Sequence, residues 1–358
     1  RAEIREEIET PGFYIVDGRI IANKVEVKPV SKEELRDALM LLNELAEKWF
    51  GYAVDRFATV VKWGVVAPFI FARKQLGREY QVPFLVLYGE RNTGKTTLAE
   101  IATIYLWGLP RSEYSTVGAK ANTEARLGEL VSKDTFPRVV NEANSMFFRA
   151  EVINVLKNCV EGIEARGKIE RKAMRIFYAL SPLIITLNPN PPIDFENLEL
   201  APKTLWVLRF SVEEMRKHEH IQKFNEEILP QLQKLSAIGN YAAGVVLSSG
   251  VDILRERDWI KLGEKLLEQA YRDAGLEPPK WIYEKYNVPS YEDVTAARAD
   301  EIRAKLINYI NEMYTRHVSK VSGGSEEDVE ALEKYIDKPM IEYRLRSLIA
   351  NDLIPFII

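Results

Sequence analysis

Phe84-Leu-Val-Leu-Tyr88-Gly89-Glu-Arg-Asn-Thr-Gly94-Lys95-Thr96 is the stretch of this sequence that decides its fold. Its apolar opening predicts a buried strand, and Gly89 to Thr96 match the pattern G-x-x-x-x-G-K-[ST] in full. Good helix formers follow from Thr97 onward. A strand, a glycine-rich turn and a helix in this order predict the phosphate-binding loop of an α/β nucleotide-binding core. An accidental glycine-rich turn is the alternative, and the flanking strand and helix disfavour it.

The residue types in this loop suit ATP and Mg²⁺. Its glycines let backbone N–H groups turn toward the β-phosphate, Lys95 reaches the β- and γ-phosphate oxygens, and the Thr96 hydroxyl binds magnesium. The start of the following helix adds a partial positive charge at the same place. The expected nucleotide-contacting residues are Gly89, Asn92, Thr93, Gly94, Lys95, Thr96 and Thr97.

A second apolar strand is predicted at Arg138–Asn141, and Glu142 follows it directly. Hydrolysis of a nucleotide needs an acid that polarises the attacking water, and we assign Glu142 to this role and, with Thr96, to the metal. Asn141 stands where such enzymes usually carry an aspartate, so it brings no charge to the ion. The alternative is a core strand that ends in a polar cap.

A third strand is predicted at Leu183–Asn188, and a proline-rich stretch follows it. If this strand lies beside the strand of the phosphate loop, Asn188 can bond to the γ-phosphate or to the attacking water. An asparagine before a proline is otherwise only a turn signal. Its position after two other nucleotide-binding elements favours the catalytic interpretation.

Basic residues cluster between Glu142 and Asn188, at Arg166, Lys168, Arg171 and Lys172. The surrounding stretch, with Gly167 near a turn, suits a β-hairpin. A net charge of −4 excludes a surface that is basic throughout, so any nucleic-acid binding has to come from a local element of this kind. A solvated charged loop is the alternative.

The order of these elements resembles that of the superfamily 3 helicases, which are AAA+ ring motors of DNA viruses, phages and plasmids and include primase-helicases. Their motif A corresponds to Gly89–Thr96, motif B to Val139–Glu142, the basic B′ element to about Lys157–Arg175, and motif C to Ile184–Asn188. The resemblance covers roughly residues 84–212. It implies an AAA+ P-loop core, hydrolysis of ATP at the subunit interfaces of a homo-hexamer, and basic hairpins that grip single-stranded or forked DNA.

Members of this family carry an arginine finger shortly after motif C, ahead of an apolar strand that closes in phenylalanine. Here the expected position holds Lys203, and Arg209 lies in the following predicted strand, Leu205–Phe210. The resemblance therefore implies that Lys203 or Arg209 supplies the cation to the neighbouring subunit, or that the finger lies elsewhere.

The rest of the chain divides into three regions. Residues 1–78 are typical of a small β-hairpin followed by a collar-like helical region, residues 79–212 of the ATPase core, and residues 213–358 of a helical region. The tail from residue 326 suits a small winged-helix-like unit. The chain opens at Arg1 without an initiator methionine, so we expect a fragment of a longer protein.

Composition points to a cytoplasmic protein without a membrane span. The single cysteine, Cys159, excludes an internal disulfide framework, and the most apolar stretch, Thr59–Ala72, is shorter than the roughly 20 residues that span a bilayer. His218 and His220 form an H-x-H pair that more simply belongs to a solvent-facing helix than to a metal site.

These observations predict an ATP-dependent DNA helicase or translocase that acts in replication of a plasmid, virus or mobile element. Two other functions stay open. One is an AAA+ nucleotide-binding switch, which would have no use for a basic hairpin. The other is an origin-binding replication initiator with weak or absent ATPase activity, which Asn141 slightly favours.

Overall fold

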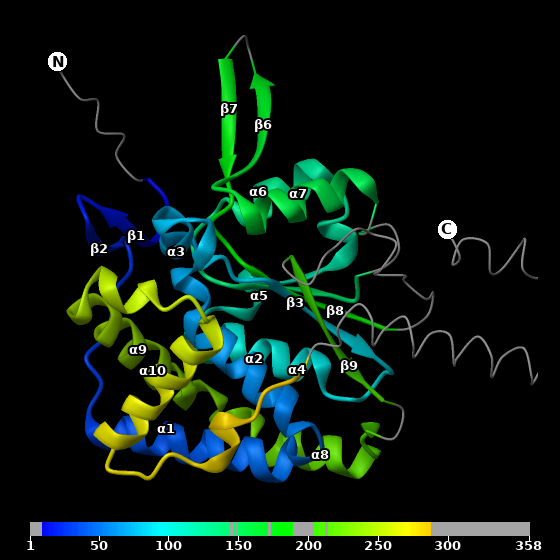
Figure 1. Cartoon of the computed structure of the whole chain (residues 1–358). Helices are drawn as coiled ribbons and strands as arrows, with labels where there is room; N and C mark the ends of the chain where they lie inside the picture. The colour runs from blue at the N-terminus through cyan, green and yellow to red at the C-terminus, as the bar shows by residue number, and fades with distance from the viewer. Residues whose placement is uncertain are drawn as a thin grey trace, which may run out of the picture. The chain divides into compact units, whose positions relative to one another are not determined.

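The structure is a computed structural model, shown in Figure 1. It describes residues 9–143, 147, 149–170, 173–188, 204–211 and 214–287. These residues belong to one compact unit, Arg1–Val288. The predicted tail from residue 326 lies outside the described residues.

A parallel sheet of five strands forms the centre of this unit. The strands are β3 (Phe84–Gly89), β4 (Ser115–Val117), β5 (Arg138–Asn141), β8 (Leu183–Leu187) and β9 (Leu205–Phe210). Their order across the sheet is β4-β5-β8-β3-β9, and each pair of neighbours runs parallel. The α/β core that the sequence predicts is therefore confirmed, and β8 lies between β3 and β5.

Both faces of the sheet are covered, so its central strands are apolar throughout. On β3, Phe84 and Val86 pack into one core and Leu85 and Leu87 into another, because successive side chains of a strand point to opposite faces. Helices α6 (Glu124–Val131) and α7 (Ala150–Glu161) cover the first face. Helix α4 (Lys95–Glu100) and a π-helical turn, Ile101–Tyr105, cover the second.

The second core continues into a layer of helices from both ends of the described chain. From the N-terminal side come α1 (Lys32–Glu44), α2 (Val54–Val66) and α3 (Ile70–Leu76), and from the C-terminal side α8 (His218–Glu227), α9 (Ser236–Ser249) and α10 (Trp259–Asp273). Helix α5 (Arg111–Tyr114) is a single short turn. The core thus runs without a break across residues 78 and 212, where the sequence predicts region boundaries.

Short sequence patterns determine where some of these helices and strands begin or end. Ser31 caps α1, with the Ser31 hydroxyl and the Glu34 carboxylate forming the reciprocal bonds of a capping box. The predicted N-terminal hairpin is β1 (Gly12–Val16) and β2 (Arg19–Asn23), which join through a turn at Asp17 and Gly18 with positive φ at both residues.

A second hairpin leaves the α/β core beyond α6 and α7 (Figure 1). It consists of β6 (Glu164–Glu170) and β7 (Ala173–Tyr178), which pair antiparallel as a sheet of their own. The buried ammonium of Lys74 fastens its base by donating to the carbonyl oxygens of Cys159 (2.8 Å) and Ala179 (2.6 Å). The hairpin that the sequence predicts is therefore present.

Within the described residues, no helix has the length and apolar character needed to cross a membrane. The apolar stretch Thr59–Ala72 lies in the core, within α2 and α3. Its Lys62 is fully buried and donates to the carbonyl oxygens of Ile282 (2.9 Å) and Glu284 (2.7 Å) and to the Glu264 carboxylate (3.0 Å).

Candidate nucleotide site

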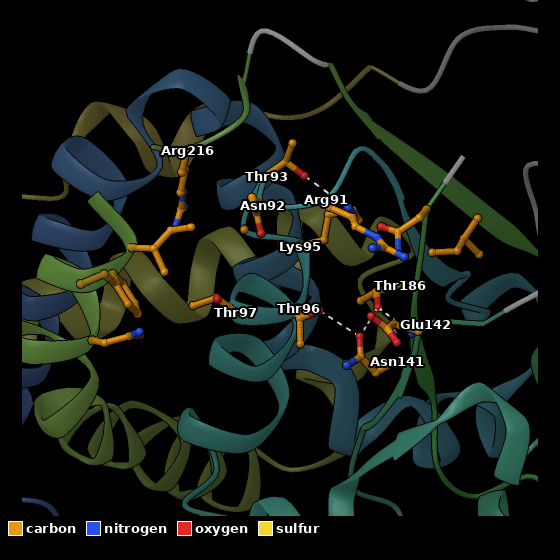
Figure 2. A pocket seen from close by; sticks show the side chains of 16 residues that line it. Arg91, Asn92, Thr93, Lys95, Thr96, Thr97, Asn141, Glu142, Thr186 and Arg216 are labelled. Atoms are coloured by element: carbon orange, nitrogen blue, oxygen red, sulfur yellow. Dashed lines mark hydrogen bonds between the residues drawn. The ribbon is translucent and has the colours of Figure 1, made fainter. Parts of the chain in front are cut away.

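A cavity opens at the carboxyl ends of β3, β5 and β8, and Figure 2 shows the side chains around it. The carboxyl ends of parallel strands lie at one edge of a sheet, and ligands of open α/β sheets bind outside that edge. Residues from the phosphate loop, from the ends of β5 and β8, and from α8 line the cavity. The predicted residues Asn92 to Thr97, Glu142 and Asn188 are all among them.

The phosphate loop takes a conformation that depends on its glycines. Gly89 has φ 151°, and a Cβ built there would lie 2.2 Å from the Phe210 carbonyl oxygen on β9. Gly94 has φ 82° immediately before α4. Any side chain at Gly89 would push β9 away from β3, which explains why the pattern requires glycine there.

Lys95 lies inside the loop and is 6% exposed. Its ammonium donates to the carbonyl oxygens of Gly89 (2.7 Å) and Glu90 and to the Thr93 hydroxyl (3.3 Å). Burial lowers the pKa of Lys95 to about 8, although the negative charges of Glu90 and Glu142 oppose this shift. Phosphate oxygens in the cavity would replace these neutral acceptors with charged ones.

Asn141 joins the phosphate loop to the two neighbouring strands. Its Oδ1 accepts hydrogen bonds from the hydroxyls of Thr96 (2.9 Å) and Thr186 (2.6 Å), and Figure 2 draws both bonds. An amide oxygen has two lone pairs, so these two donors satisfy it. With its proton directed at Asn141, the Thr96 oxygen keeps its lone pairs for a metal ion. The asparagine thus orients the threonine without bringing charge to the ion.

Glu142 is exposed to the cavity and has a left-handed backbone, with φ 51°. Its N–H donates to the Thr186 hydroxyl (3.2 Å). A Cβ built on Gly118 would lie 2.6 Å from the Ala143 Cα and 3.0 Å from the Glu142 carbonyl oxygen, so the segment after β4 packs closely against this turn. A left-handed glutamate costs of order 1–3 kcal/mol, and such strain concentrates at functional sites.

Oxygen ligands for Mg²⁺ are present at this end of the cavity. The Thr96 hydroxyl and the Glu142 carboxylate are of the type that magnesium prefers, and phosphates and waters usually complete its shell. Among the described residues, no group of three or more histidine, cysteine or acidic side chains could hold a metal by itself. The residues therefore fit an ion that arrives with a nucleotide.

The opposite wall of the cavity comes from the segment after β9 and from α8. Arg216, Ile221, Phe224 and Asn225 line it. No signal in the sequence identifies these residues, because they follow no motif and lie far along the chain from the loop. The H-x-H pair belongs to the same helix, and His220 packs against the Trp49 ring, with their ring centroids 4.8 Å apart.

The structure describes only one of the two residues, Lys203 and Arg209, that are expected to supply a cation to a neighbouring subunit. Lys203 lies outside the described residues. Arg209 is exposed on β9, the edge strand of the sheet, with its guanidinium 5.4 Å from the centre of the Tyr88 ring. Arg209 is not part of the wall of its own subunit's cavity.

Arg166, one of the four predicted DNA-contacting cations, packs into the stem of the β6–β7 hairpin. Its side chain is 14% exposed, pairs with Glu124 (3.6 Å) and covers Gly128 of α6. Arg166 is therefore largely covered in the stem, and its contact with DNA stays a prediction. Lys168 lies further along β6, and Arg171 and Lys172 lie outside the described residues.

Comparison with known proteins supports the same core. Residues 10–174 match the family model of the Aq_aa27 P-loop NTPase domain. No curated protein matches the chain. The matched family model, the parallel sheet and the complete phosphate loop together show a P-loop NTPase core, as the sequence predicts.

Two solved structures are similar to the chain. One is the SCCmec type IV Cch active helicase, with 10% identity, a TM-score of 0.41, and coverage of 91% of this chain and 63% of that one. The other is the apo A form of the NrS-1 C-terminal region, with 16% identity, a TM-score of 0.32, and coverage of 92% and 70%. The chain thus spans 63% of the length of the Cch structure. These values describe distant likeness and carry no activity over to this chain.

Nucleotide binding should take up a proton at mildly alkaline pH. Burial lowers the pKa of Lys95 to about 8, and a bound triphosphate would raise this pKa by supplying negative charge. At pH 8 we expect uptake of about half a proton, with affinity falling as pH rises above 8. Calorimetric titration of ATP in two buffers with different ionisation enthalpies measures this uptake, and Lys95→Met serves as the control. An enthalpy that does not depend on the buffer contradicts the assignment.

Asn141→Asp should lower the magnesium concentration that supports half-maximal ATPase activity, with turnover equal or higher. An aspartate can accept both hydroxyl bonds of Asn141 and adds a charge beside the ion. Asn122→Asp, two residues before α6 and outside the cavity wall, is the matched control. Glu142→Gln should bind ATP and leave it unhydrolysed. If Asn141→Asp inactivates an active enzyme, Asn141 has a role other than orienting Thr96.

Proposed function

We propose that this chain is the ATPase motor of a superfamily 3-type DNA helicase or translocase, a homo-hexameric ring that acts in the cytoplasm in replication of a plasmid, virus or mobile element. The observation that carries the proposal is the position of the β6–β7 hairpin. It leaves the same core that holds a complete phosphate loop, and its sequence is rich in lysine and arginine in a protein of net negative charge.

In the proposed reaction, a water molecule attacks the γ-phosphorus of ATP while the bond to the β-phosphate oxygen breaks. Lys95 neutralises charge on the β- and γ-phosphate oxygens, and Thr96 and Glu142 would hold a magnesium ion, which would supply further positive charge to the phosphates. Glu142 accepts the water's proton, and Asn188, directly after β8, orients the water or the γ-phosphate. The half-buried Ile221 and the Phe224 ring on α8 provide an apolar wall for the adenine ring of ATP.

The chain path links this chemistry to the hairpin. From Glu142 the chain runs through α7 into β6, and from the end of β7 it returns through β8 to Asn188. The hairpin is thus inserted between the two residues that would contact the γ-phosphate and its water. A shift of either residue on hydrolysis would act on the base of the hairpin. This arrangement supports coupling between ATP hydrolysis and movement of DNA.

The ring is supported by the position of Arg209. Its side chain is exposed at the sheet edge, while its backbone is fixed, because its carbonyl oxygen accepts from the Arg56 guanidinium (2.8 Å). Arg56 in turn pairs with Glu214 and packs over the Phe210 ring. A fixed, exposed arginine that is absent from its own cavity suits a site on a neighbouring subunit. Lys203 remains the other candidate.

A replication initiator with weak ATPase activity is the second candidate function, and Asn141 is the observation that favours it. Without a second acid beside Glu142, the ion is held less tightly. In that case the wild-type protein hydrolyses little ATP with or without DNA, and Glu142→Gln changes nothing. A nucleotide-binding switch without DNA work is opposed by the basic hairpin.

Replacing Lys168, Arg171 and Lys172 with alanine should abolish stimulation of the ATPase by single-stranded DNA and leave basal hydrolysis intact. For a single strand, the salt dependence of DNA binding should flatten by about 0.7 log units for every phosphate that the protein no longer neutralises. The matched control removes three exposed cations from the helical layer, Lys234, Arg255 and Lys261, with the same change in net charge. Equal weakening of DNA binding in both variants would show a general charge effect and no role for the hairpin.

Arg209→Ala and Lys203→Ala test completion of the site between subunits. A trans cation contributes about 10³–10⁵ in rate in related phosphoryl transfer, so the responsible variant should be inactive alone. Mixed with Lys95→Ala subunits, it should regain activity, since some interfaces then combine an intact loop with an intact cation. Arg255→Ala is the control for removal of an exposed arginine. If the variant subunits assemble normally and mixing restores no ATPase activity, neither residue completes the site of a neighbouring subunit.

A further inference from the structure

Tyr52 and Arg216 lie beside the phosphate loop and belong to no motif, and Arg216 also lines the cavity. Tyr52 precedes α2 in the turn Gly51–Ala53, and Arg216 lies in the segment that joins β9 to α8. Both side chains converge on loop residues 92–94 from the side of the helical layer, and Figure 2 shows Arg216 beside the loop. These are the loop residues whose backbone N–H groups would surround the β-phosphate.

Each of these loop residues is held by a separate contact. The backbone N–H of Arg216 donates to the Asn92 carbonyl oxygen (2.9 Å), at a residue whose φ is 61°. The Tyr52 hydroxyl donates to the Thr93 carbonyl oxygen (3.0 Å). The Arg216 guanidinium covers Gly94 so closely that a Cβ there would lie 2.6 Å from its Nη2.

The two side chains also hold each other. The Nε and Nη2 of Arg216 donate to the Tyr52 hydroxyl oxygen (2.9 and 2.7 Å), and Nη2 also donates to the Trp49 carbonyl oxygen (3.1 Å). The guanidinium stacks 4.4 Å from the centre of the Phe50 ring. Partial burial raises the pKa of Tyr52, with Arg216 opposing the shift. The hydroxyl therefore keeps the proton that it donates to Thr93.

We propose that Tyr52 and Arg216 are positioning residues that hold loop residues 92–94 in the phosphate-binding conformation before the nucleotide arrives. This inference rests on the proposed nucleotide-binding function. A left-handed asparagine and a left-handed glycine so close together are strained or entropically costly without outside contacts. Contacts made in advance reduce the ordering that binding would otherwise require.

The proposal predicts a specific kinetic pattern. Tyr52→Phe keeps the ring and removes the bond to Thr93 and the two bonds from Arg216. The KM for ATP and the Kd values for ATP and ADP should therefore all rise about tenfold. ATP and ADP should weaken equally, because both place a β-phosphate in the loop. The kcat should change little, since contacts kept equally in ground and transition states affect KM alone. Arg216→Lys should act in the same direction, because lysine lacks the planar fork that bonds and stacks at once.

Tyr241→Phe is the matched control. The Tyr241 hydroxyl donates to Asp273 (2.5 Å) between α9 and α10, so this variant also removes a hydroxyl bond, but away from the cavity. It should leave both Kd values unchanged. Thermal unfolding of each variant separates a decrease in stability from a decrease in affinity.

The measured Kd and kcat values distinguish failure of the positioning role from failure of the proposed nucleotide-binding function. If wild type binds ATP and Tyr52→Phe binds ATP and ADP within about twofold of wild type, the positioning role is overturned. The same conclusion follows if kcat falls and Kd stays unchanged. If wild type binds no nucleotide, the proposed function itself fails, and that result is distinct from a wild-type-like Tyr52→Phe.

Discussion

One amide oxygen, that of Asn141, ties together the three strands that build the site. Thr96 at the start of α4, Thr186 on β8 and Asn141 on β5 come from separate parts of the sequence, and two hydroxyl bonds fix their relative positions. In this arrangement β8 lies between β3 and β5 and pairs parallel with both. The sheet order therefore determines which side chains can meet around a nucleotide. In the observed order β5 is separated from β3 by β8, and the Thr96 hydroxyl at the start of α4 still reaches Asn141.

Glu142 lies at the same edge of the sheet, in a strained backbone conformation that its neighbours hold in place. β5 ends at Asn141, and the chain turns at once through the left-handed Glu142. The close approach of Gly118 and the bond from the Glu142 N–H to Thr186 hold this turn. A relaxed backbone at this position would aim the carboxylate elsewhere. The strain is thus maintained by neighbours that have no chemical role of their own, which is expected where geometry at a site matters more than local stability.

In the helical layer, two buried cations hold loops and helix ends in place by donating hydrogen bonds to their carbonyl oxygens. Arg73 donates to the carbonyl oxygens of Tyr80, Leu254, Glu256 and Arg257, and the adjacent Lys74 donates to those at the base of the hairpin. Carbonyl oxygens in loops and at helix ends lack partners within their own element, and leaving them buried and unpaired is costly. A long cation reaches them where no backbone N–H can. The end of α3 thereby holds both the C-terminal helices and the hairpin.

The features that could be predicted from the sequence are those that depend on neighbouring residues. The loop pattern, the strands around it, the capping box at Ser31 and both hairpins are encoded over a few positions, and the structure contains them. The contacts of Tyr52 and Arg216 with the loop join residues more than 40 and 120 positions apart, and no local pattern marks them. Sequence also cannot show which cations of a basic cluster are covered. The charge of Arg166 suggested DNA binding, but its side chain packs against Glu124 and Gly128 in the stem of the hairpin.

The difference between Arg166 and Arg209 shows how burial separates cations that look alike in the sequence. Each has an aromatic ring near its guanidinium, Phe177 for Arg166 and Tyr88 for Arg209. Arg166 has an acidic partner and is mostly covered, so binding a phosphate there would first require breaking that pair. Arg209 is exposed on an edge strand while Arg56 fixes its backbone. An anion can reach the exposed guanidinium of Arg209, and this difference supports the proposal that Arg209 acts at a neighbouring site.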